Sequence, residues 1–124
     1  MPRTAVPYTP LLPNSSLADP AGTTIDATLV TNGVVINNAD PEHTLIRVTN
    51  SSGSTRVVTV KAGNGTPALS AGQGDLAASI PTTATAWFPP LASGRFQQKG
   101  TQLFVDFAAG TTGSITVFKI PRAV

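Results

Sequence analysis

Apolar and polar residues alternate along several short runs of this 124-residue chain. In TLIRVTN (44–50), Ile46 and Val48 face one side of an extended strand and Arg47 faces the other. QLFVDF (102–107) repeats the pattern, with its three apolar residues at alternate positions facing inward. Because side chains of a strand alternate between its two faces, this period predicts strands with one buried face.

Other runs rich in β-branched residues lie between clusters of Gly, Asn, Ser and Pro. They are 23–30, 34–36, 55–62, 75–80, 82–88 and 114–120. The turn SSGS (51–54) predicts a hairpin between the strand before it and the strand after it, and the glycine-rich 63–74 predicts a long flexible connection. Seven or eight strands and no helix predict an all-β fold. We expect an antiparallel β-sandwich or barrel of the jelly-roll or immunoglobulin-like type.

The first twenty residues differ from the rest, because they hold five of the eleven prolines. Proline fixes φ and has no N–H to donate, so the segment should be an extended arm rather than a helix or central strand. We therefore divide the chain into an arm (1–22) and a β-domain (23–124). Apolar side chains on the arm indicate that it lies on a protein surface. They are Val6, Tyr8, Leu11, Leu12 and Leu17.

Composition narrows the classes of function. The chain is 40% hydrophobic and 11% charged, its formal net charge is +2, and it has no Cys. Without Cys, neither a disulfide framework nor a Cys-based metal or redox site can form. The chain has no run of Lys and Arg and no apolar run of 18 residues, so we expect neither nucleic acid nor a membrane as partner.

Groups that could support catalysis or bind a metal are few. The one His, His43, has Asp40 and Glu42 beside it, and imidazole with carboxylates can bind Zn²⁺. Asp-Pro also opens turns, and charged residues collect at exposed turns, which is the interpretation we adopt. No acid/base pair, G-x-S-x-G elbow or phosphate-binding glycine loop can be recognised. We expect no enzymatic activity, no metal and no cofactor.

Aromatic and Arg side chains near strand ends are the remaining candidates, because such residues anchor many protein interfaces. Trp87 is the only Trp and opens WFPP, while Arg95 and Phe96 are adjacent in SGRFQQK. Trp87 and Phe88 are neighbours on a strand, so one should be buried and the other exposed. The alternative is that both pack in the core or cover its end.

Four segments of the chain, in the order in which they occur, carry a resemblance to a known group of proteins. GTTIDATLVTNGVVINN and TLIRVTNSSGSTRVVTVKAG come first, WFPP follows, and GTQLFVDFAAGTTGSITVFKI closes the run from about 23 to 120. A strand pair with an N-S-S-G turn, a late V-D-F strand and a final T-V-x-x-I strand together resemble small phage proteins that decorate or cement icosahedral capsids.

This resemblance implies a structural virion protein on the outer capsid surface, made and assembled in the cytoplasm of the bacterial host. Its partner would be the major capsid protein, whose neighbouring subunits it would bridge as a homo-oligomer, with a trimer favoured. The arm would become ordered on the shell, or exchange between sister subunits instead. The residues expected to contact a partner are Arg3, Val6, Tyr8, Leu11, Leu12, Trp87, Arg95 and Phe96.

Other roles are compatible with a small β-domain. A receptor- or carbohydrate-binding module of a phage tail fibre or spike would need exposed aromatic side chains, and the chain has one Trp and one Tyr. A connector or tail subunit would form closed rings. A small hydrolase has the least support, because a single His is a poor basis for a catalytic triad.

Overall fold

The computed structural model describes residues 3–63 and 74–121. Its strands are β1 (Thr4–Ala5), β2 (Tyr8–Pro10), β3 (Thr23–Ile25), β4 (Val34–Asn37), β5 (Thr44–Asn50), β6 (Arg56–Val60), β7 (Leu76–Ile80), β8 (Thr85–Phe88), β9 (Gln102–Phe107) and β10 (Gly113–Lys119). The helices are α1 (Ala27–Asn32), α2 (Ser93–Phe96) and the 3₁₀ helix η1 (Pro41–His43). No helix within these described ranges is long and apolar enough to cross a membrane.

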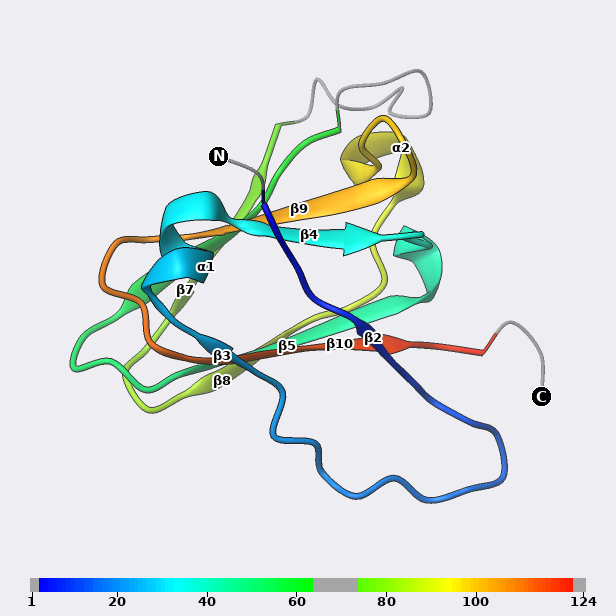
Figure 1. Ribbon diagram of the computed structural model, residues 1–124, viewed down its shortest axis with the longest axis horizontal. Coiled ribbons are helices and arrows are strands. Elements are labelled where there is room, and N and C mark those ends of the chain that lie inside the picture. Colours follow the sequence, from blue (N-terminus) through cyan, green and yellow to red (C-terminus); the bar gives the residue numbers. More distant parts are fainter. Residues whose placement is uncertain (1–2, 64–73, 122–124) are drawn as a thin grey trace.

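The strands form two sheets that pack face to face (Figure 1). Sheet A has the order β1-β4-β9-β6-β7, and sheet B has the order β2-β10-β5-β8, with β3 also paired to β10. This arrangement confirms an all-β sandwich. Two details differ from the prediction. Ten strands are described rather than seven or eight, and the sheets are mixed, because β1 runs parallel to β4 and β2 runs parallel to β10.

The core lies between the sheets and is built from alternate residues of the strands, as the pattern predicted. In β5, Ile46 and Val48 are completely buried while Arg47 faces outward. Burying one such aliphatic side chain contributes about 1.5–3 kcal/mol to folding. The largest fully buried side chains are Ile25, Val34, Ile36, Ile46, Val48, Val58, Val60, Ile80, Leu103, Val105, Ile115 and Val117.

The N-terminal arm lies against its own domain and adds one short strand to each sheet (Figure 1, dark blue). Thr4 and Ala5 pair with β4 of sheet A, and β2 pairs with the end of β10 in sheet B. Pro7 stands where the chain passes from one sheet to the other, a position that needs no ladder hydrogen bond. Val6, its neighbour, is 3% exposed and belongs to the core. Residues 4–10 therefore have partners within the chain.

The strand predicted over 23–30 is wrong in its second half, and with it the absence of helix. β3 ends at Ile25, and α1 begins two residues later. Asp26 caps α1 by accepting a hydrogen bond from the backbone N–H of Leu29 at 2.9 Å, and Gly33 ends it with a φ of +80°. These two capping residues outweigh the preference of Thr, Leu and Val for strands.

The hairpin predicted around SSGS is also wrong, because β5 lies in sheet B and β6 lies in sheet A. The buried amide of Asn50 holds the crossing between them. Its Nδ2 donates to the carbonyls of Ser54 (3.0 Å) and Ile80 (2.8 Å), and its Oδ1 accepts from the N–H of Ser52 at 2.9 Å. The flexible connection predicted over 63–74 lies, apart from its two end residues, outside the described residues.

Candidate interaction surface

Residues 11–22 form a loop that joins β2 to β3 and is fixed at both ends on sheet B. The N–H of Leu11 donates to the carbonyl of Lys119 at 2.9 Å. At the other end, the Arg47 guanidinium donates to the carbonyl of Pro20 at 2.5 Å and forms an ion pair with Asp19. Because β2 and β3 both pair with β10, the loop starts and ends along one strand, while its middle extends away from the sheets (Figure 1).

The loop exposes large apolar side chains. Leu12 is 67% exposed and Leu17 is 50% exposed, and among the described residues only Trp87 (52%) and Val57 (38%) are other large hydrophobic residues left in water. Exposed hydrophobic residues are common singly, so two of them on one anchored loop make the loop a candidate contact surface. We call residues 11–19 the contact loop.

The end of the loop requires glycine. Gly22 has a φ of +80°, in the left-handed region that favours glycine. A Cβ at this position would overlap the Thr116 hydroxyl and would lie 2.9 Å from the carbonyl oxygen of Ile115. Close approach of the loop backbone to β10 therefore depends on this residue.

The outer face of sheet B carries an aromatic cluster of Arg47, Trp87 and Phe118. The rings of Trp87 and Phe118 stack with centroids 5.7 Å apart and an angle of 21° between their planes. The guanidinium carbon of Arg47 lies 5.9 Å from the first ring and 5.6 Å from the second, within the range of cation–π attraction. Phe88 is 3% exposed and Trp87 is 52% exposed, which confirms that one of these neighbours is buried and the other exposed.

Three arm residues expected at a partner interface make contacts within this chain. Arg3 lies over the ring of Phe104 at 4.3 Å and forms an ion pair with Asp106 at 2.5 Å. Tyr8 shares a hydrogen bond of 2.8 Å with the Thr44 hydroxyl, and Val6 is buried in the core. Leu11 is half-buried at the start of the contact loop. Of the five arm candidates, Leu12 is thus the large apolar side chain that faces water.

Arg95 and Phe96 are the last two residues of α2. Arg95 donates to the carbonyl of Gly74 at 3.0 Å and to that of Asp75 at 3.2 Å, and its guanidinium lies 4.7 Å from the Phe96 ring. Phe96 is 3% exposed. In this fold the pair holds α2 against the start of β7 and covers the core.

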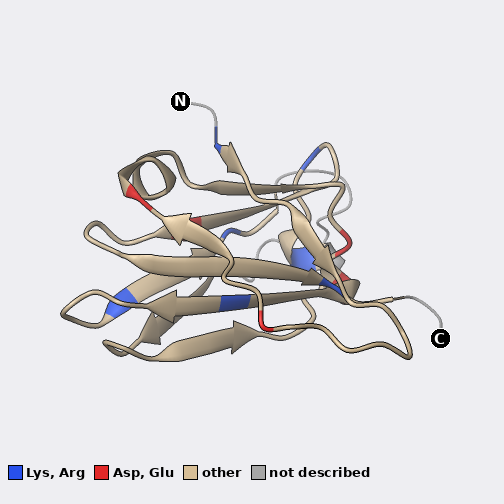
Figure 2. Ribbon diagram, turned by 60° about the horizontal axis from the view of Figure 1, so that its bottom comes forward, with Lys and Arg blue, Asp and Glu red and all other residues tan. Residues whose placement is uncertain are grey.

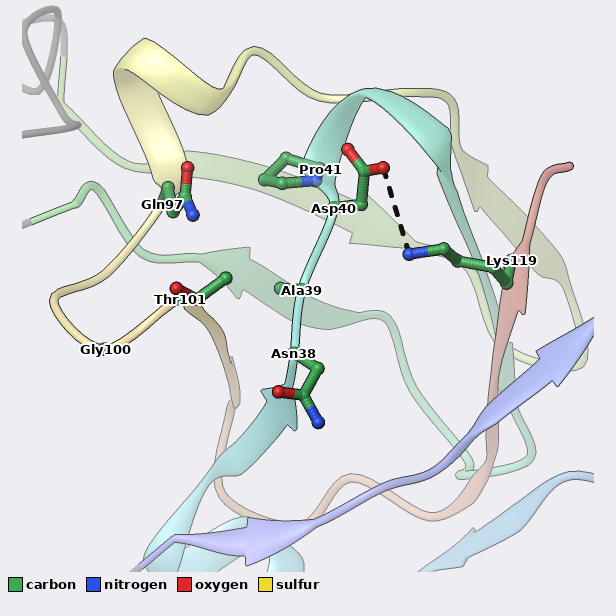
Figure 3. Close-up of a pocket in the computed structure, with 8 residues that line it drawn as sticks. All are labelled: Asn38, Ala39, Asp40, Pro41, Gln97, Gly100, Thr101 and Lys119. Carbon is green, nitrogen blue, oxygen red and sulfur yellow. Dashed lines mark ion pairs between the residues drawn. The ribbon is translucent and has the colours of Figure 1, made fainter. Parts of the chain in front are cut away.

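A polar recess of about 470 Å³ lies between the segment before η1, the loop after α2 and the end of β10 (Figure 3). The carboxylate of Asp40 faces the Lys119 ammonium at 3.9 Å. The Nδ1 of His43 lies 3.2 Å from the same carboxylate, without the geometry of a hydrogen bond. Within the described residues, no three His, Asp or Glu side chains come close enough together to hold a metal ion.

Charged residues are sparse and scattered along the chain (Figure 2). The Lys61 Nζ lies 2.9 Å from an oxygen of the Asp75 carboxylate, and this ion pair shifts the pKa of both side chains. The N–H of Ala62 and the Lys61 ammonium both bind the Asp75 carboxylate and lower its pKa. The hydrogen bond and charge of Asp75 in turn raise the pKa of Lys61.

Several residues of these surfaces were not singled out from the sequence. The alternation in 44–50 placed Arg47 on the outer face, but nothing in the sequence indicated that it would bind Asp19 across 28 residues. Phe118 occupies an outward position on β10, and Trp87 covers it, so its burial depends on a neighbouring strand. Comparison of the chain with models of known protein families, with curated proteins and with solved structures finds no match.

Proposed function

We propose that this chain is a structural virion protein that binds the outer surface of an icosahedral phage capsid and bridges neighbouring capsid subunits. The observation that carries this proposal is the contact loop, which is anchored at both ends and exposes Leu12 and Leu17. The capsid as partner follows from the resemblance of the sequence to phage decoration proteins. The contact surface is narrower than the whole arm, because residues 4–10 are paired within the chain.

The contact loop suits weak binding that is repeated at many equivalent positions of a shell. Pro13 within the loop, with Pro10 and Pro20 directly before and after it, restricts its backbone, so little further conformational entropy is lost when it binds. Burying one exposed Leu contributes at most about 1.5–3 kcal/mol, and a single loop therefore binds weakly. Several loops presented together gain affinity through effective concentration.

We favour a homotrimer, because a three-fold or quasi-three-fold position of a shell would engage three loops at once. A protein that binds only the assembled shell stabilises that shell by mass action. Exchange of the arm between sister chains would preserve this arrangement, since β1 and β2 would pair in the same way with a neighbour's β4 and β10.

The sandwich itself is of the immunoglobulin-like rather than the jelly-roll type in this proposal. From β4 onward, seven described strands divide into four in sheet A and three in sheet B. Constant-type immunoglobulin domains have seven strands in sheets of four and three, whereas jelly rolls have eight.

The proposal is tested by the thermal stability of shells. Shells are assembled from the capsid protein of the same phage, and their melting temperature is measured by calorimetry with and without a saturating amount of this protein. The molar mass of the free protein is measured by light scattering. We expect a higher melting temperature for the decorated shells and a free mass of three chains. Shells that melt at an unchanged temperature would contradict the proposal, and a large closed ring in solution would favour a connector or tail subunit.

A further inference from the structure

A shallow hollow lies beside Trp87 on the outer face of sheet B. Its volume is about 470 Å³, within the range of roughly 300–1,000 Å³ that small-molecule sites occupy. The lining residues are Asp19, Pro20, Ala21, Arg47, Thr49, Thr85, Trp87 and Ser114. They come from the end of the loop after β2 and from β5, β8 and β10, so segments far apart in the sequence build one site.

Trp87 supplies a fixed apolar surface in this hollow. Its ring stacks on Phe118, which is 4% exposed and therefore immobilised, and about half of the Trp87 side chain remains open to solvent. An aromatic ring held in place loses little entropy when a ligand packs on it. Trp87 is thus preorganised to accept an apolar face.

The rest of the hollow is polar and offers hydrogen bonds. The side chain of Asp19 is 85% exposed, and its carboxylate accepts hydrogen bonds. The hydroxyls of Thr49 and Thr85 lie 3.0 Å apart on neighbouring strands, and Ser114 adds a third hydroxyl. These groups can bind donors and acceptors on the edge of a ligand whose face packs on the Trp87 ring.

The charge of the hollow is balanced. Arg47 is the cation among the lining residues, its side chain is only 12% exposed, and it already binds Asp19, the carbonyl of Pro20 and, at 3.0 Å, the Thr116 hydroxyl. A phosphate or other anion would meet the exposed Asp19 carboxylate without a cation free to compensate. The ligand should therefore be neutral, which disfavours nucleotides.

We infer that this hollow is a carbohydrate-binding site, in which a neutral pyranose ring stacks on Trp87 and its hydroxyls bond to Asp19 and Thr85. A pyranose has an apolar C–H face and a rim of hydroxyls, and this matches an aromatic surface flanked by a carboxylate and hydroxyls. An apolar peptide would displace water from those polar groups without bonding to their remaining donors and acceptors, at a cost in free energy. The site does not depend on shell binding, since Leu12 and Leu17 are not among its lining residues.

Fluorescence tests the inference directly, because Trp87 is the only Trp of the chain. The full-length protein is titrated with disaccharides of glucose, galactose, mannose and N-acetylglucosamine. We expect at least one of them to shift the Trp87 emission saturably. Asp19→Asn and Thr85→Ala should each weaken that binding, the former by about tenfold or more, as loss of a hydrogen bond to a charged group does.

Val57→Ala, on the outer face of sheet A, is the matched control and should bind as the parent does. Trp87→Ala, measured by NMR saturation transfer after its melting curve shows that it folds, should lose binding. The inference is overturned if no sugar shifts the emission up to its solubility limit, or if both rim variants bind as tightly as the parent. A response to a proline-rich peptide alone would also overturn it and would assign the hollow to a peptide.

Discussion

Asn50 is a buried amide that joins parts of both sheets at a single residue. It is 1% exposed, and its side chain bonds to backbone groups of Ser52 and Ser54 within the turn at 51–55 and of Ile80 at the end of β7. A buried polar group left without its partner costs about 1–3 kcal/mol. Asn50→Ala removes both the donor and the acceptor, and leaves carbonyls such as that of Ile80 without this partner.

We therefore expect Asn50→Ala to lower the free energy of unfolding by about 2–3 kcal/mol, measured by urea denaturation. Ser79→Ala, an exposed position on β7, is the control and should change stability by no more than about 0.5 kcal/mol. Equal stability of the two variants would show that the bonds of Asn50 are replaced by water.

The Lys61–Asp75 pair predicts a dependence of stability on pH. The folded chain lowers the pKa of Asp75 below its ordinary value of 3.8, so the carboxylate stabilises the fold above that pH. This contribution is lost as the pH falls through the folded-state pKa. The raised pKa of Lys61 acts in the opposite sense: its contribution is present below 10.5 and is lost as the pH rises through the folded-state value.

Asp75→Asn should thus be less stable than the parent at neutral pH, and the difference should shrink as the pH falls below 3.8. The effect is small, because both side chains are more than a third exposed and water screens the pair. Chemical denaturation of both proteins at several pH values measures it. A difference that stays constant down to the lowest pH would contradict this account of Asp75.

At the scale of elements, the sequence predicted strands most accurately where one face of the strand is exposed to solvent and the other is buried. β5 and β9 follow the alternation residue by residue. It failed where a local capping pair decided the structure, as Asp26 and Gly33 do for α1. It also failed at the turn after β5, because the sheet that a strand joins is decided by distant partners rather than by the turn.

The candidate surfaces were predicted in part for the same reason. The arm's composition singled out Leu12 as a candidate contact residue, and the strand period predicted that one of Trp87 and Phe88 is exposed without deciding which. The polar side chains beside Trp87 could not be predicted in the same way. Asp19 lies next to Trp87 only in the folded chain, where the end of the loop after β2 returns to sheet B. Val6 is buried although its segment reads as an extended arm, because β1 and β2 on either side of it pair with β4 and β10.

Anchoring of the contact loop depends on Gly22. Gly22→Ala should lower the free energy of unfolding by about 1–2 kcal/mol for the left-handed backbone alone, and by more because the new Cβ meets β10. Gly53→Ala is the matched control, since a Cβ there would meet nothing within 4 Å and its φ is not in that region. Thermal melting compares the two variants, and an equal loss would contradict the close approach of the loop to β10.

At the scale of the whole molecule, both proposed binding surfaces belong to the side of the sandwich formed by sheet B. The contact loop starts and ends on β10, and the hollow beside Trp87 spans β5, β8 and β10. On sheet A, by contrast, Val57 is the one large apolar side chain exposed to solvent within the described part of the chain. This asymmetry lets a variant on sheet A serve as a control for both surfaces.

Co-sedimentation with shells measures the central claim most directly, namely that the chain binds a capsid through the contact loop. The parent protein is compared with the double variant Leu12→Ser and Leu17→Ser and with the control Val57→Ser, after melting curves and light scattering show that all three share one fold and one mass. We predict that the parent and the control pellet with the shells and that the loop variant stays in the supernatant. If the loop variant pellets as well as the parent, or if none of the three pellets, the claim is contradicted.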